Sequence, residues 1–153
     1  MIRKAYLATA IVLVSTLGAS AQEKKLDQSN LPPAVQKTVQ EQSKGATIKG
    51  FSTEVEHGKR TYEAEMMVNG HSRDIEVAED GTLNEVEEEV AFSALPKNVQ
   101  HALTANAAGA QITKVESLTK QGKLVAYEAA TLTGAKRGEI QISPNGGQLA
   151  HEE

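Results

Sequence analysis

One segment of this chain occurs twice, in the same order and at a nearly constant spacing. Residues 31–36 (Leu-Pro-Pro-Ala-Val-Gln) match residues 95–100 (Leu-Pro-Lys-Asn-Val-Gln), an offset of 64. The matches continue through a Gly-Ala-x-Ile segment at 45–48 and 109–112. They then continue through Tyr-Glu-Ala at 62–64 and 127–129, where the offset becomes 65. Repetition that aligns a helix start, turns and strands in order indicates a tandem duplication of one structural unit.

Each unit begins with the pattern of a short helix. Proline in the first turn loses no hydrogen bond, because that N–H has no partner inside the helix. Leu31, Val35 and Val39 are spaced four residues apart and form one apolar stripe, which predicts a helix from about Pro32 to Ser43 that Gly45 ends. The second unit has the corresponding stripe in Leu95, Val99 and Leu103, followed by Gly109.

After each of these glycines the apolar period changes to two. Tyr62, Ala64, Met66 and Val68 alternate with other residues, as do Ile75 and Val77 around a glutamate, which is typical of half-buried strands. Turn dipeptides of the hairpin type separate these runs. They are His57-Gly58, Asn69-Gly70 and Asp80-Gly81 in the first unit, and Gln121-Gly122, Thr133-Gly134 and Asn145-Gly146 in the second.

The predicted fold is therefore α+β, with two tandem repeats at 31–90 and 91–153, each a short helix followed by a four-stranded antiparallel meander. We expect the helices to pack on one sheet face. The two sheets would lie side by side or form one continuous sheet of about eight strands. Ile48 and Phe51 are three residues apart, as are Ile112 and Val115, so alternation is broken at the same place in both units. A β-bulge would restore the facing of these side chains.

Residues 1–21 have the layout of a secretory signal peptide. Arg3 and Lys4 precede an apolar run that is too short for a bilayer, and Ala19-Ser20-Ala21 offers a cleavage site before Gln22. Residues 22–30 are polar and are predicted to be a flexible lead-in. The expected location is periplasmic or secreted, with no stable membrane anchor after cleavage.

Composition excludes several classes of partner and of site. The chain has no cysteine, so its core must be stable without disulfides. Without the two basic signal residues it carries 14 basic and 20 acidic residues, a balance that offers no footprint for nucleic acid.

Acidic residues are concentrated in the first repeat. Between residues 47 and 90 there are 12 acidic residues and four basic ones. Strand alternation places many of these carboxylates on the sheet face opposite the apolar residues. That face could bind a basic partner or a divalent cation, or it could be a solvated surface that discourages edge pairing. The candidate binding residues are Glu54, Glu56, Glu63, Glu65, Met67, Asp74 and Glu76.

No catalytic or metal-ligating pattern accompanies this surface. The four histidines, His57, His71, His101 and His151, are not spaced as zinc ligands. Asp80-Gly81 lacks the spaced oxygen ligands of a calcium loop, no serine lies in a Gly-x-Ser-x-Gly elbow, and no phosphate-binding loop is present. We therefore predict a protein that is not an enzyme and that uses no cofactor and no metal.

The chain resembles PepSY-like domains, and the wider group includes exported proteins whose fold is compared with that of beta-lactamase inhibitory protein. The resemblance lies in the Leu-Pro helix start, in Tyr62-Glu63-Ala64-Glu65, in Ile75-Glu76-Val77 and in Asp80-Gly81-Thr82-Leu83. It extends from Leu31 to Leu149 as two copies. The second copy departs from it at Thr131-Leu132-Thr133-Gly134 and at Gly138. The resemblance implies a secreted or periplasmic binding or inhibitory module and supplies no catalytic residue.

The predicted function is thus a non-enzymatic module that binds or inhibits an envelope or secreted protein, for which the resemblance suggests a hydrolase. The alternative is a divalent-cation-binding or metal-responsive envelope protein that uses the acidic sheet face of the first repeat. An enzyme and a purely structural, edge-pairing protein are the remaining classes. The sequence names no partner.

Overall fold

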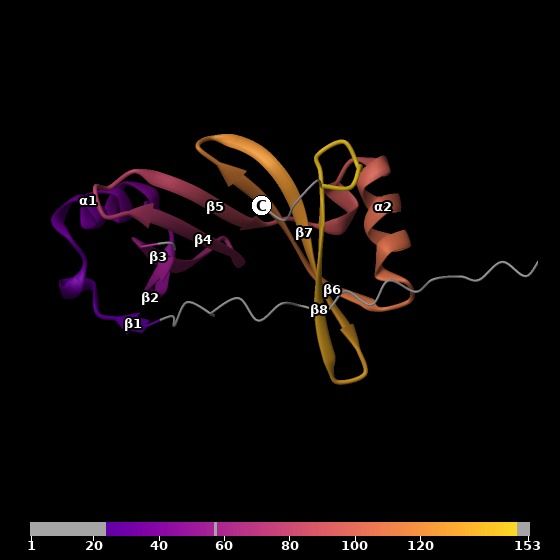
Figure 1. Cartoon of the computed structure of the whole chain (residues 1–153), viewed down its shortest axis with the longest axis horizontal. Helices are drawn as coiled ribbons and strands as arrows, with labels where there is room; N and C mark the ends of the chain where they lie inside the picture. The colour runs from indigo at the N-terminus through magenta and orange to yellow at the C-terminus, as the bar shows by residue number, and fades with distance from the viewer. Residues whose placement is uncertain (1–23, 57, 150–153) are drawn as a thin grey trace, which may run out of the picture.

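The computed structural model describes residues 24–56 and 58–149 as two helices packed on one sheet (Figure 1). The predicted signal peptide lies outside these residues. In chain order the elements are β1 (Lys24–Leu26), the 3-10 turn η1 (Gln28–Asn30), α1 (Pro33–Gln42), β2 (Thr47–Glu56), β3 (Lys59–Val68), β4 (His71–Ala78), β5 (Leu83–Glu89), η2 (Phe92–Ala94), α2 (Lys97–Ala107), β6 (Gln111–Lys120), β7 (Lys123–Thr133) and β8 (Lys136–Ile142).

All strands belong to one eight-stranded antiparallel sheet whose spatial order follows the chain order from β1 to β8. Two of its hairpins turn through adjacent residues with positive φ, at Asn69-Gly70 and at Gln121-Gly122. Such turns match the twist of the strands that they join. The β5–β6 pair joins the strands that follow α1 to those that follow α2, so the sheet is continuous, one of the two arrangements predicted.

Each helix covers its own half of the sheet. Val35 and Val39 of α1 pack with Ile75 and Val77 in one buried cluster, and Val99 and Leu103 of α2 pack with Val115 and Ile142 in another. The register shows that both helices lie on the same face. On β5, Val86 packs against the first cluster, and Glu88, two residues further, lies on the same face. Glu88 pairs with Ser117 of β6, which in turn pairs with Tyr127 of β7. Tyr127 packs against the second cluster, so both clusters share this face.

The two halves also share local details. The side-chain amide of Gln36 donates to the carbonyl of Leu31 at 2.8 Å, and that of Gln100 donates to the carbonyl of Leu95 at 2.8 Å. Register shifts fall between Ile48 and Gly50 on β2 and between Ile112 and Lys114 on β6, so the predicted bulges are confirmed in both halves.

Two sequence predictions need correction. The lead-in expected to be flexible contains β1, which pairs with residues 51–53 of β2. The otherwise unpaired backbone of the β2 edge accepts this strand, and Leu26 packs against the first core cluster. The segment predicted as the second repeat has three described strands rather than four, because residues 143–149 form a turn closed by Ser143 and Gly147 and continue without strand pairing.

Among the described residues, no helix is long and apolar enough to cross a membrane.

Candidate functional site

The sheet face turned away from α1 and α2, here called the helix-free face, gathers most of the strand carboxylates. The register aligns them in rows that cross neighbouring strands. One row contains Ser52, Glu63, Glu76, Glu85 and Lys120; the next contains Glu65, Asp74, Glu87 and Leu118; the third contains Glu89, Glu116, Glu128 and Gln141. Period-two alternation puts one side chain from each strand into a row, and antiparallel pairing brings the carboxylates of neighbouring strands together.

A shallow hollow lies over the middle of β2–β5 on this face. Its volume is about 200 Å³, and six acidic residues contribute to its lining: Glu54, Glu63, Asp74, Glu76, Glu85 and Glu87. Neutral donors and one lysine orient part of this set. The Ser52 hydroxyl donates to Glu63 at 3.1 Å, and the Asn84 amide donates to Glu76 at 3.0 Å. Lys120 lies 3.5 Å from Glu85.

One cluster of carboxylates joins the two halves of the sheet. One oxygen from each of Asp74 (β4), Glu87 (β5) and Glu116 (β6) lies within 4.8 Å of the other two. We call these three residues the seam cluster. Glu116 is 4% exposed, and the Lys114 ammonium lies 2.7 Å from its carboxylate. Burial of a charge requires such a partner.

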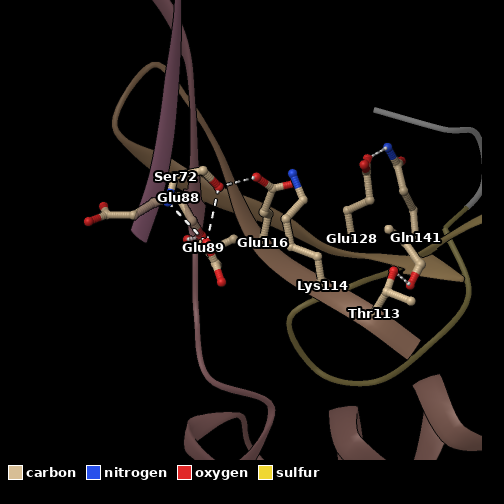
Figure 2. A network of polar contacts seen from close by, with 10 residues as sticks. Ser72, Glu88, Glu89, Thr113, Lys114, Glu116, Glu128 and Gln141 are labelled. Carbon is tan, nitrogen blue, oxygen red and sulfur yellow. Dashed lines mark hydrogen bonds and ion pairs between the residues drawn. The ribbon is translucent and has the colours of Figure 1, made fainter. Parts of the chain in front are cut away.

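A serine links the seam cluster to the strands on either side of β5. The Ser72 backbone N–H donates to Glu89 at 3.0 Å, while its hydroxyl lies 3.2 Å from Glu116 and 3.3 Å from Glu89. Figure 2 shows Ser72 between these two glutamates, with Lys114 beside Glu116. A hydroxyl has one hydrogen to donate, and the N–H already serves Glu89. The hydroxyl is therefore available to Glu116 and bridges β4 to β6.

Burial and mutual repulsion raise the pKa values of carboxyl groups on this face. Burial first, and then the charges of Glu128, Glu116, Glu85 and Asp74, raise the pKa of Glu87 to about 8. Burial and the neighbouring Glu116 raise the pKa of Asp74 above its usual value. Burial also raises the pKa of Glu85, although Lys120 opposes the shift. Of these three groups, Glu87 keeps its proton well above the usual range.

The spacing of the seam cluster would also let a cation approach three oxygens, but Lys114 already supplies positive charge to Glu116. Asp74 alone belongs to the set predicted from sequence. The histidines offer no addition to this group: His71 and His101 are exposed, and His57 and His151 lie outside the described residues.

The structure places the predicted binding residues Glu54, Glu63, Glu65, Met67, Asp74 and Glu76 on the helix-free face. Four of them, Glu54, Glu63, Asp74 and Glu76, line the hollow together. The side chain of Glu56 lies outside the described set. Sequence reasoning missed Glu85, Glu87, Glu116 and Glu128 as site residues. The alternation of Glu85, Glu87 and Glu89 on one strand was the available signal for the first two.

No family model and no curated protein sequence matches this chain. Solved structures do share its fold. A BLIP-like protein from Bacteroides fragilis has a TM-score of 0.57 and 22% sequence identity, with 80% of this chain and 86% of that chain covered. A DUF2874 family protein from Bacteroides ovatus has a TM-score of 0.60 and 16% identity, with 78% and 84% covered. A protein from Bacteroides eggerthii described as a proposed periplasmic protein has a TM-score of 0.63 and 15% identity, with 78% and 86% covered. The chain therefore has a BLIP-like α+β fold.

Proposed function

We propose that this chain is an exported, non-enzymatic binding protein that consists of two PepSY-like repeats and acts in the periplasm or outside the cell. The shared details of the two halves support the repeat, since helix starts, amide contacts and bulges recur at equivalent positions. The signal-like start of the sequence supports export, and the Bacteroides eggerthii neighbour is consistent with a periplasmic location.

The observation that carries the proposal is the helix-free face itself. Both helices lie on the other side of the sheet, so within the described residues no helix covers it, although Glu116 and Leu118 of β6 are buried on it. Carboxylates from β2 to β7 line this open face, and few lysines neutralise them. Such a field attracts and orients a partner that presents lysine or arginine side chains. The partner class is thus a basic surface of an envelope or secreted protein, and a hydrolase that the module inhibits is the candidate that the BLIP-like fold favours.

Binding of a divalent cation is the alternative function. The seam cluster has a suitable spacing, but Lys114 already forms an ion pair with Glu116, one of its three carboxylates. Melting temperatures measured with calcium and with a chelator distinguish cation binding from binding of a protein partner. Stabilisation by calcium would favour the alternative, and equal melting temperatures would favour the protein partner.

The main test is capture of a partner from periplasmic extract with the mature protein, followed by calorimetry with the purified partner. The variant Glu63→Lys/Glu65→Lys reverses two charges on the helix-free face. The control Glu41→Lys/Glu79→Lys makes the same change in net charge at exposed residues of α1 and of the β4–β5 turn. We expect the first variant to lose the partner and the control to keep it. Equal affinity of both variants would remove the acidic face as the recognition surface.

A further inference from the structure

Glu87 lies at the centre of the helix-free face, beside the only strand pair that joins the two halves of the described sheet. Its neighbours come from every adjoining strand. Asp74 faces it from β4, Glu116 and Lys114 from β6, Glu128 from β7, and Glu85 from its own strand. The nearest of these carboxyl oxygens lie within 4.8 Å. Four acids and one lysine therefore surround one further acid.

The lysine does not neutralise Glu87 directly. Lys114 is engaged by Glu116 at 2.7 Å. The cross-strand partner of Glu87 on β6 is Leu118, which is 1% exposed, so an apolar side chain occupies the position from which a cation could have approached. A carboxyl group in this setting is more stable in its neutral acid form.

The two acids of β5 that share this face, Glu85 and Glu87, differ in their cationic partners. Two neighbouring carboxyl groups repel each other when both are ionised, so the proton stays on the group without a cation. Because Glu85 has Lys120 at 3.5 Å and Glu87 has no such partner in the described part of the chain, the proton belongs on Glu87.

We propose that Glu87 is a proton-carrying switch in the recognition face, and that docking of a basic partner releases this proton. The inference rests on the proposed function. The unbound face holds Glu87 as the acid. A lysine or arginine side chain of the partner that enters the hollow pairs with the carboxylate, and the proton passes to solvent. No other bond forms or breaks. Binding then strengthens as pH rises, up to roughly tenfold per pH unit for one released proton.

The first test follows Glu87 in the free mature protein. The carboxyl carbon signal of Glu87 is recorded by NMR across the pH range in the presence of a chelator. A midpoint near 8, well above the range of ordinary glutamates, supports the proposal. A midpoint in the ordinary range would overturn it. A shift of this signal on addition of calcium at neutral pH would also overturn it, because the cluster would then hold a metal ion.

The second test measures the linkage, with a synthetic arginine-rich peptide as probe and a glutamine-substituted peptide as its control. Calorimetry at neutral pH in buffers of different ionisation enthalpy counts the protons released. We expect about one proton for the wild type and for Glu88→Gln, which lies on the same strand but the opposite face, and none for Glu87→Gln. Binding without proton release would overturn the switch and leave the proposed function standing. Absence of peptide binding at every pH would overturn recognition of basic partners, whereas the NMR midpoint would still report the proton on Glu87.

Discussion

The Lys114 ammonium and the Glu116 carboxylate lie 2.7 Å apart on the same face of β6, two residues from each other along the strand. Glu116 is almost fully buried, and it also lies within hydrogen-bonding distance of Ser72 on β4. Lys114 stabilises more than one acid, because its charge also opposes the raised pKa of Asp74. Although desolvation alone would lower it, the pKa of Lys114 itself is raised by Glu116, Asp74 and Glu87. Lys114 is therefore a cation shared by several acids at the seam between the halves.

Replacement of Lys114 by methionine should destabilise the protein, and more so at alkaline pH. The variant keeps the bulk of the side chain but leaves Glu116 and Asp74 without their cation. Above about pH 8 we expect a loss of roughly 1–2 kcal/mol, reduced from the cost of a fully buried pair because Lys114 is partly exposed. Near pH 5 the loss should be smaller, since more of the neighbouring acids are protonated. Urea unfolding at both pH values measures the loss of unfolding free energy, with Lys37→Met on the exposed side of α1 as control. An equal loss at both values would contradict the electrostatic explanation.

The variant Glu87→Gln should remove part of the pH dependence of stability. The folded-state pKa of about 8 exceeds the ordinary value of 4.5, so the folded protein binds this proton more tightly than the unfolded chain does. The resulting stability is fully present below the ordinary value and is lost as pH rises from there through about 8. Glutamine keeps the neutral form at every pH. We expect the variant to be more stable than wild type above that range by roughly 1–2 kcal/mol, after allowance for partial exposure.

The matched control for this measurement is Glu88→Gln, which removes one acid from the helix side of the same strand. Its unfolding free energy should keep the wild-type pH profile. If Glu87→Gln showed the same profile as Glu88→Gln and wild type, the proton would reside elsewhere on the helix-free face.

Local patterns in the sequence predicted much of the fold because they reflect local physics. Proline at 32 and 96 and the glycines that follow each helix mark the helix ends. Three-residue spacing of apolar side chains predicted both bulges. The pairing of β1 with β2 was not predictable in this way. Residues 24–26 carry no apolar alternation, and their strand exists because an edge of β2 is available to them.

The acidic face was predicted only in its first half. Alternation within a strand places Glu63 and Asp74 on a face, but it does not say which strand of the second half lies beside β5. That pairing, Glu87 opposite Leu118 and Glu89 opposite Glu116, is a long-range contact between strands that α2 separates in the sequence. The seam cluster, and with it the raised pKa of Glu87, therefore appears only in the folded structure.

Arg73 should be important for the end of α1, and the equivalent position in the second half of the chain is a glycine. Its guanidinium donates to the backbone carbonyl of Gln42 at 3.1 Å and to the Gln42 side chain at 3.0 Å. A cation at a helix C-terminus also stabilises the helix through its interaction with the helix dipole. The residue 65 positions later is Gly138, which cannot make these contacts.

We expect Arg73→Met to cost about 1–2 kcal/mol and to speed amide hydrogen exchange in the last turn of α1. The variant Gln42→Ala, which keeps the backbone acceptor, should cost less. Exchange in α2 should not change. Equal acceleration in both helices would indicate a global loss of stability instead of a local one.

Gly81 and Gly146 should be the least replaceable turn glycines, because each turn touches the helix of its own half. A Cβ atom on Gly81 would lie 2.9 Å from the carbonyl oxygen of Ala34, and one on Gly146 would lie 2.9 Å from that of Asn98. Both residues have positive φ, but so does Gly45, where an added Cβ would meet nothing within 4 Å. Gly45→Ala therefore isolates the backbone cost, about 1–2 kcal/mol.

Gly81→Ala and Gly146→Ala add a steric clash with helix backbone, which cannot move aside as the end of a side chain can. Overpacking of this kind typically costs a further 1–3 kcal/mol or so. Urea unfolding of the three variants under one condition separates the cost of the positive-φ backbone from the cost of the clash with the helix. If all three lost the same stability, the close approach of turn and helix would be a relaxed contact. If both clashing variants lost more and by similar amounts, the two halves would share one mode of helix docking, as descent from a single unit requires.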